Sequence, residues 1–364
     1  MILHRYFAQR FIFVLGGVIG VFGLLMAFVE LVERLRTLRN VDVSFGQVVQ
    51  LALLNLPDSL YRIIPLLVII ATIWLFLGLA RSSELVVTRA AGRSALRALV
   101  APCLVAFIFG LVTIGIFNPI VASTSREFDA RLSTLTGEGS SFTLASDGLW
   151  LRQGSTNGQT VIRADATNLD GTELSGVTFI TFTLDGGPTR RIEATSARLT
   201  PGQWDIANAK VWPLADAENP EAVAEYHETF QIPSSLTVDQ IRDSFGSPSS
   251  VPIWELPAFI ERLRTAGFSA RRHAVWLQSE LAMPLFLVAM VLIGAAFTMR
   301  PQRGGKTGQM VLWAILISFG LYFVRNFASI LGENGQIPIA LAAWAPPFVA
   351  VGFAFGLLLH LEDG

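Results

Sequence analysis

The stretch FIFVLGGVIGVFGLLMAFV, residues Phe11–Val29, contains no charged residue and is long enough for a helix that crosses the hydrocarbon core of a bilayer. The second and fifth of the apolar stretches in the chain are shorter, and each adjoins an arginine, Arg62 or Arg325. One such stretch alone could be the core helix of a soluble domain, but six predict a polytopic α-helical membrane protein. The other five are Ile63–Ala80, Ala98–Phe117, Leu281–Met299, Gly308–Val324 and Ile337–Leu359.

The composition supports a membrane class and excludes several others. Of 364 residues, 52% are hydrophobic and only 15% are charged. A net charge of -1 argues against a nucleic-acid partner, which needs a basic surface. The single cysteine, Cys103, lies in an apolar stretch, and the four histidines are scattered, so neither a disulfide nor a metal site is expected. No secretory cleavage site follows the first apolar stretch, which we expect to remain as an anchor.

The segment between the third and fourth apolar stretches has a different character. Short alternating runs such as Val177–Leu184 and Arg191–Leu199 are separated by Asp-Gly, Asn-Gly, Gly-Gly and Pro-Gly turn signals. This pattern predicts an inserted all-β domain, an antiparallel sandwich or jelly roll, at residues 119–253. Residues 1–118 then carry three spanning helices, and residues 254–364 carry an amphipathic connecting helix and three more.

The basic residues predict an orientation. They gather before the first span and in the second and fourth connections, which the positive-inside rule places in the cytoplasm. Both termini are then cytoplasmic, and the β domain lies outside. The residues concerned are Arg5, Arg10, Arg81, Arg89, Arg93, Arg97, Arg300, Arg303 and Lys306.

No motif for covalent chemistry is present in the sequence. Gly304-Gly-Lys-Thr307 resembles the end of a phosphate-binding loop, but Arg300 stands where that loop needs its first glycine. Serine nucleophile elbows and HExxH helices are also absent from the sequence. We therefore expect a non-catalytic protein.

The second connection, Arg81–Gly92, is more informative. Ser82 or Ser83 suits the start of a short helix, Glu84 suits its positive end, and Gly92 suits its close. This indicates an amphipathic helix at 82–92, which composition alone would equally describe as an interfacial anchor.

Ser83-Glu-Leu-Val-Val-Thr-Arg-Ala-Ala-Gly92 resembles the coupling-helix motif of the LptF/LptG family, the lipopolysaccharide-export permeases of Gram-negative bacteria. Leu3–Tyr6, Gly148–Trp150 and Met283–Leu285 are similar to the LptG branch. The resemblance implies a permease subunit of an ABC transporter in the inner membrane. It would extract lipopolysaccharide and pass it to a periplasmic bridge.

The resemblance also implies partners. These are an LptB-like ATPase dimer, an LptF-like permease, an LptC-like protein and lipopolysaccharide. The chain itself would bind no cofactor, because ATP and magnesium belong to the ATPase. By position in the motif, Glu84 would contact the ATPase, with Leu85, Val86 and Arg89 as neighbours.

For the substrate, the resemblance implies a cavity between the first, second and fifth spans with basic residues near its outer mouth. Arginines suit lipid A phosphates, although they could instead pair with Glu30, Glu33 or Glu127. At Glu280 the sequence departs from family members that have a basic residue. The candidate phosphate-binding residues are Arg34, Arg36, Arg39, Arg126, Arg62 and Arg325. The candidate cavity linings, for which helix packing is the alternative role, are Leu24, Phe28, Leu66, Ile70, Phe319 and Phe323.

Two other interpretations remain open from the residues alone. One is an ABC permease of another class, for lipoprotein release or signalling, which usually has four spans. The other is a membrane-anchored binding or sensor protein.

Overall fold

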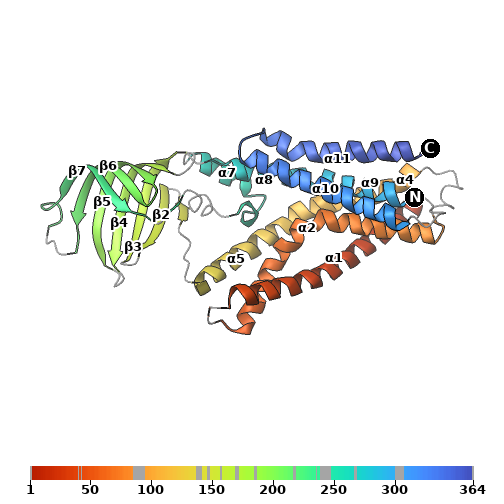
Figure 1. Cartoon of the computed structure of the whole chain (residues 1–364), viewed down its shortest axis with the longest axis horizontal. Helices are drawn as coiled ribbons and strands as arrows, with labels where there is room; N and C mark the ends of the chain where they lie inside the picture. The colour runs from red at the N-terminus through yellow and green to blue at the C-terminus, as the bar shows by residue number, and fades with distance from the viewer. Residues whose placement is uncertain are drawn as a thin grey trace. The chain divides into compact units, whose positions relative to one another are not determined.

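The computed structural model describes residues 2–39, 41, 43–84, 95–136, 142–145, 148–155, 158–168, 172–183, 187–215, 219–234, 236–237, 247–265, 269–299 and 307–362. The chain divides into two compact units (Figure 1). A helical unit comprises residues 1–132, 248–256 and 271–364, and a β unit comprises residues 133–247 and 257–270.

The helical unit contains the apolar stretches that the sequence predicts as spans. Five of its described helical segments are long and apolar enough to cross a membrane, and a bent pair makes a sixth. The segments are α1 (Ile2–Thr37), α2 (Phe45–Arg81), α4 (Ala95–Val112) continued by the π-helical turn η1 (Thr113–Phe117) and α5 (Asn118–Thr136), α10 (Thr307–Glu333) and α11 (Ile339–Glu362). The bent pair is α8 (Arg271–Leu281) and α9 (Met283–Thr298), with an angle of 49°.

Local sequence explains where these helices begin and bend. Ser44 and Gln47 form a reciprocal capping box that starts α2. Pro284 stands at the first turn of α9, where its missing N–H cannot continue the ladder of α8, so the pair bends. Pro57 and Pro65 lie inside α2, which a membrane helix tolerates when neighbouring helices pack against it.

Helix α9 forms the centre of the helical unit. Phe286, Leu287, Met290 and Ile293 are fully buried in one hydrophobic core with residues of α2 and α4. Helix α4 approaches closely at Gly110, where an added Cβ would lie 2.6 Å from Pro284 Cα. Packing of this kind holds membrane helices together, since lipid is as apolar as their side chains.

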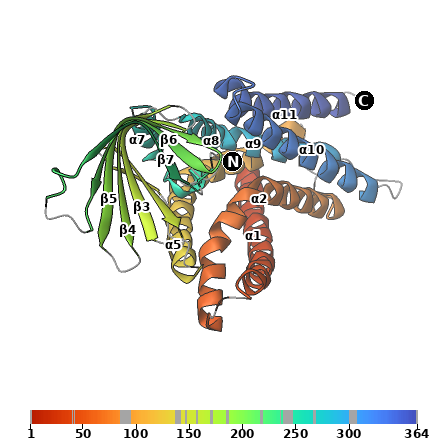
Figure 2. The same ribbon diagram turned by 60° about the vertical axis from the view of Figure 1, so that its left-hand side comes forward.

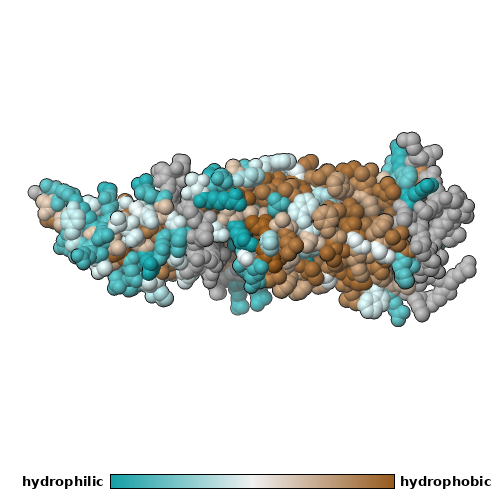
Figure 3. Space-filling model, turned by 90° about the horizontal axis from the view of Figure 1, so that it is seen from above, coloured by the Kyte–Doolittle hydropathy of each residue, from teal (hydrophilic) through white to brown (hydrophobic). Residues whose placement is uncertain are grey.

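Helices α1 and α10 lie on the outside of the helical unit. In an apolar stretch of 18 residues within each, only 11% of the residues are buried, against 61% in the corresponding stretch of α2. Figure 3 shows hydrophobic residues covering the visible face of the helical unit. The start of α1, the end of α2, the start of α10 and the end of α11 all lie at one end of this unit (Figure 1).

The β unit is one antiparallel sheet of seven described strands (Figure 2). Trp204 and Phe179 fill its core with an edge-to-face contact at 6.2 Å, and Ile162 and Ile192 are fully buried beside them. The strands are β1 (Phe142–Ala145), β2 (Gly148–Ser155), β3 (Gly158–Thr167), β4 (Glu173–Thr183), β5 (Pro188–Thr200), β6 (Gln203–Pro213) and β7 (Glu225–Pro233).

The inserted all-β domain is confirmed, and its strand order is a meander. Each described strand pairs with the next along the chain in one antiparallel sheet. The third span is also longer than its apolar stretch, since α5 continues to Thr136, beyond the boundary at residue 118. The predicted connecting helix is α7 (Leu256–Thr265), which follows a short 3-10 turn, η2 (Pro248–Ser250).

Candidate functional site

Glu84, the residue with the clearest predicted role, is bound by α1 of its own chain. Its carboxylate accepts hydrogen bonds from Tyr6 Oη at 2.8 Å and from Arg10 Nη1 at 2.8 Å. Ser82 Oγ, at the C-terminal end of α2, donates a third bond at 2.7 Å. Arg10 also donates to the Tyr6 hydroxyl, and its guanidinium lies 5.7 Å from the centre of the Tyr6 ring. Glu84 therefore links the end of α2 to the start of α1.

These contacts set the ionisation of Glu84. Partial burial raises the pKa of its carboxyl, but the hydrogen bonds from Ser82, Arg10 and Tyr6 and the charge of Arg10 outweigh that effect. The net result is a pKa below the ordinary value for glutamate, so the carboxylate is charged at neutral pH. The other predicted coupling residues, Leu85, Val86 and Arg89, lie outside the described residues.

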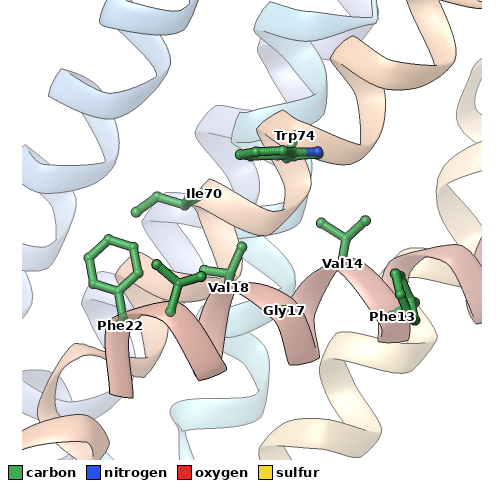
Figure 4. Close-up of a pocket in the computed structure, with 8 residues that line it drawn as sticks. Phe13, Val14, Gly17, Val18, Phe22, Ile70 and Trp74 are labelled. Carbon is green, nitrogen blue, oxygen red and sulfur yellow. The ribbon is translucent and has the colours of Figure 1, made fainter. Parts of the chain in front are cut away.

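An apolar groove of about 320 Å³ lies between α1 and α2. In Figure 4, Val14, Val18 and Phe22 of α1 point toward the space beside Ile70 and Trp74 of α2. Its volume falls in the range of small ligand pockets, and its lining is almost wholly apolar. Phe13, Gly17 and Val21 complete the lining.

Of the predicted cavity residues, Ile70 lines this groove. Leu66 is half-buried one turn earlier on α2, while Leu24 and Phe28 continue the exposed face of α1 beyond Phe22. Phe319 and Phe323 are exposed on α10. Tyr322 of α10 donates to the carbonyl of Arg62 in α2 at 2.9 Å, which joins these two helices.

Near the end of α1, Arg34 contacts residues of its own chain. Its Nη2 lies 3.4 Å from Glu30 Oε2, and its guanidinium lies 4.9 Å from the centre of the Phe128 ring. Glu30 also accepts bonds from Asn55 at 2.9 Å and Ser59 at 2.5 Å. Arg34 therefore pairs with an acidic residue of its own chain, which is the alternative to phosphate binding that the sequence left open.

The remaining predicted arginines fall into two groups. Arg36, Arg39 and Arg126 are exposed and form no ion pair with any other residue that the structure describes. Arg62 forms an ion pair with Asp58 at 2.7 Å, and Arg325 packs 5.3 Å from the Phe286 ring. Both lie within helices rather than at their ends, because α2 and α10 extend past the apolar stretches.

A buried polar pair lies deeper in the helical unit. Glu280 of α8 is 1% exposed and accepts a hydrogen bond from the Tyr61 hydroxyl of α2, with the positive charge of Arg325 nearby. Buried carboxylates in membrane helices need such partners. This pair links α2 to α8 immediately before the bend at Ala282.

Sequence reasoning did not identify Tyr6, Arg10, Tyr61 or Trp74 as site residues. Tyr6 and Arg10 are four residues apart and so share one helix face. This spacing was the one feature of the sequence that could have indicated a shared partner. In the part of the chain that the structure describes, no cluster of His, Cys, Asp and Glu fits a metal ion. Residues 304–306 of the P-loop-like segment lie outside that part.

The fold and the site together define a class, a polytopic membrane protein whose two groups of spanning helices are separated by an all-β insert. The described residues alone provide five candidate spans, or six with the bent pair, which is more than the four spans expected for a permease of the lipoprotein-release class.

The family model for the lipopolysaccharide export system permease LptF/LptG matches residues 5–360, and the chain belongs to this family. It is 24% identical over 301 residues to the lipopolysaccharide export system permease protein LptG of Escherichia coli K12, covering 81% of this chain and 80% of that protein. It is 23% identical over 345 residues to LptG of Haemophilus influenzae Rd, covering 93% of each chain.

Proposed function

We propose that this chain is the LptG-like permease subunit of an inner-membrane ABC transporter that extracts lipopolysaccharide. The observation that carries the proposal is the family match over residues 5–360, which includes both groups of spans and the β insert. The relatives named LptG support the same branch.

The outside of α1 suits an amphiphilic lipid. Its exposed apolar face from Val21 to Val32 covers about 16 Å at 1.5 Å per residue. That length is close to the depth of one leaflet of a hydrocarbon core about 30 Å thick. Arg36 and Arg39 follow at the end of this face, where they would meet phosphates, with Arg126 as a further donor. Arg34, Arg62 and Arg325 would need to leave their present partners to do so.

Energy would come from a separate LptB-like ATPase, which would bind ATP and magnesium. The termini and the connection after α2 would be cytoplasmic, in agreement with the positions of the basic residues. Glu84, with Leu85, Val86 and Arg89, would contact a basic surface of the ATPase. A helical contact of this kind is required because the permease itself would perform no hydrolysis.

The β insert would lie in the periplasm and pass the lipid onward. An LptC-like partner with strands of its own would add to an edge strand, β1 or β7, by main-chain pairing. An LptF-like permease would complete the cavity.

Co-purification tests the ATPase part of this proposal. The native chain, co-expressed with an LptB-like ATPase, should retain it through affinity purification in detergent. Glu84→Lys should reduce the captured ATPase at least tenfold, whereas the matched reversal Glu33→Lys, exposed near the far end of α1, should have no effect. Equal capture by the native chain and Glu84→Lys would remove Glu84 from the contact.

A further inference from the structure

Helix α1 is attached to the rest of the helical unit mainly through its first half. Phe7, Phe11, Leu15 and Val18 recur at helical spacing and are buried in the hydrophobic core that includes α2. None of the residues from 19 to 37 is buried. The first half is therefore packed in the core, whereas the second half is held by polar contacts, those of Glu30 with Asn55 and Ser59 of α2 among them.

The cluster around Glu84 is attached to that first half. Tyr6 and Arg10 lie on the same half of α1 as Phe7 and Phe11, and both bind the Glu84 carboxylate. Among the described residues, Ser82, just past the end of α2, donates to the same carboxylate, which is thereby bound from both sides of the contact. A single half-exposed ion pair contributes only ~0.2–1 kcal/mol, so the consequence of this arrangement is geometric rather than a matter of stability.

The backbone between Ser82 and Glu84 has an uncommon conformation. Ser83 has a φ of 58°, the left-handed region that non-glycine residues seldom adopt. This conformation ends α2 and directs the following carboxylate to α1. The turn and the start of α1 are thereby joined through one side chain.

We propose that Tyr6 and Arg10 are positioning residues that tie α1 to Glu84, so that a displacement of Glu84 on contact with the ATPase tilts α1 about its buried half. This proposal rests on the proposed function. The half from Ile19 to Thr37, which lies outside the core, is about 27 Å long, so a tilt of about 5° would move its far end by about 2.4 Å. Such a movement would act on the end of the groove between α1 and α2 that lies beyond Val18, at Val21 and Phe22.

The test measures the position of α1 in the full chain with its ATPase in nanodiscs. Spin labels at Leu35 on α1 and Leu53 on α2, both exposed, are introduced on a Cys103→Ala background. The distance between the labels is compared without nucleotide and with ATP and vanadate. Release of lipopolysaccharide and ATP hydrolysis are measured on the same samples.

In the native background, the label distance should change on ATP trapping. Arg10→Gln should reduce that change and the lipid release by at least half, while the ATPase stays bound and hydrolyses ATP. Tyr6→Phe, which removes one oxygen, should give a smaller reduction. Arg10→Lys should retain most of both, and Arg5→Gln, an exposed arginine on the same helix, should change neither.

The outcomes separate the tie from the proposed function. If the native chain captures no ATPase or releases no lipid, the proposed function fails, and the tie fails with it. If the native chain works and both Arg10→Gln and Tyr6→Phe match it in distance change and release, only the tie is overturned. Loss of ATPase capture in Arg10→Gln would also overturn the tie, because it would show that Arg10 orients Glu84 for docking instead.

Discussion

At the residue scale, polar side chains within the apolar helices carry most of the specific information. Three glutamates accept hydrogen bonds from a second helix, and each therefore links two helices of the helical unit. They are Glu30, Glu84 and Glu280. The motif drew attention to Glu84, but its contacts with Tyr6 and Arg10 were not predictable, because 78 and 74 residues separate them from it along the chain. Local patterns do not encode contacts of that separation.

Loss of the Tyr61 hydroxyl should destabilise the helical unit. Tyr61→Phe leaves the buried Glu280 carboxyl without this donor, at a cost of about 1–3 kcal/mol. The apparent Tm of the purified protein in detergent, followed by circular dichroism, should fall. Tyr226→Phe, at a tyrosine that is 76% exposed in the β unit, is the control and should leave Tm unchanged. An unchanged Tm in Tyr61→Phe would show that the carboxyl has other adequate partners.

The contacts of Glu84 predict a pH dependence. Burial raises the pKa of its carboxyl, but the bonds from Ser82, Arg10 and Tyr6 bring it below the ordinary value. A depressed pKa means that the tie is fully formed above the ordinary carboxyl range, about pH 4.3, and is lost as pH falls through the lower folded value. Carbon-13 NMR of labelled glutamate, assigned with Glu84→Gln, should show this low midpoint. Arg10→Gln should raise the midpoint, and an unmoved midpoint would contradict the contact.

The exposed arginines at the end of α1 and on α5 should affect substrate rather than assembly. Reversal of Arg36 or Arg126 to Glu should lower lipopolysaccharide release from proteoliposomes severalfold, because a phosphate would then meet a negative charge. ATPase capture should be unaffected. Arg198→Glu, an exposed arginine of the β unit, is the matched control. Undiminished release would remove Arg36 and Arg126 from the substrate site.

At the element scale, the spanning helices and the strands were predictable from the sequence. Runs of about 20 apolar residues mark the spans, and alternation with turn signals marks the strands. The extent of each helix was less predictable, because α1, α2 and α5 continue into segments with charged residues. The single sheet was not predictable either, since local alternation does not say which strands pair. The helix predicted at residues 82–92 lies outside the described residues from position 85 onward.

The crossing of α4 and α9 provides a test of helix packing. An alanine Cβ at Gly110 would lie 2.6 Å from Pro284 Cα, so Gly110→Ala must separate the two helices. We expect a loss of about 1–3 kcal/mol, as for other overpacked sites. Gly16→Ala is the matched control, since no atom lies within 4 Å of its Cβ position and alanine favours a helix. Thermal unfolding in detergent should show a lower Tm for Gly110→Ala alone, and equal values would contradict this packing.

At the scale of the whole molecule, each part has a distinct place in the proposed transport. Helices α1 and α10 present apolar surface to the outside, and the β insert presents strand edges. In the proposed function, Glu84 would contact the ATPase. The proposed function therefore depends on coupling between ATP hydrolysis by a partner and movement of lipid past this chain.

The most direct measurement is ATP-dependent release of lipopolysaccharide from proteoliposomes. The vesicles contain this chain with its LptB-like, LptF-like and LptC-like partners, and a soluble acceptor protein collects the lipid. We expect lipopolysaccharide release that requires both ATP and this chain and that falls to background with Glu84→Lys. Release that is equal with and without this chain, or no release from the complete assembly with ATP, would contradict the proposed function.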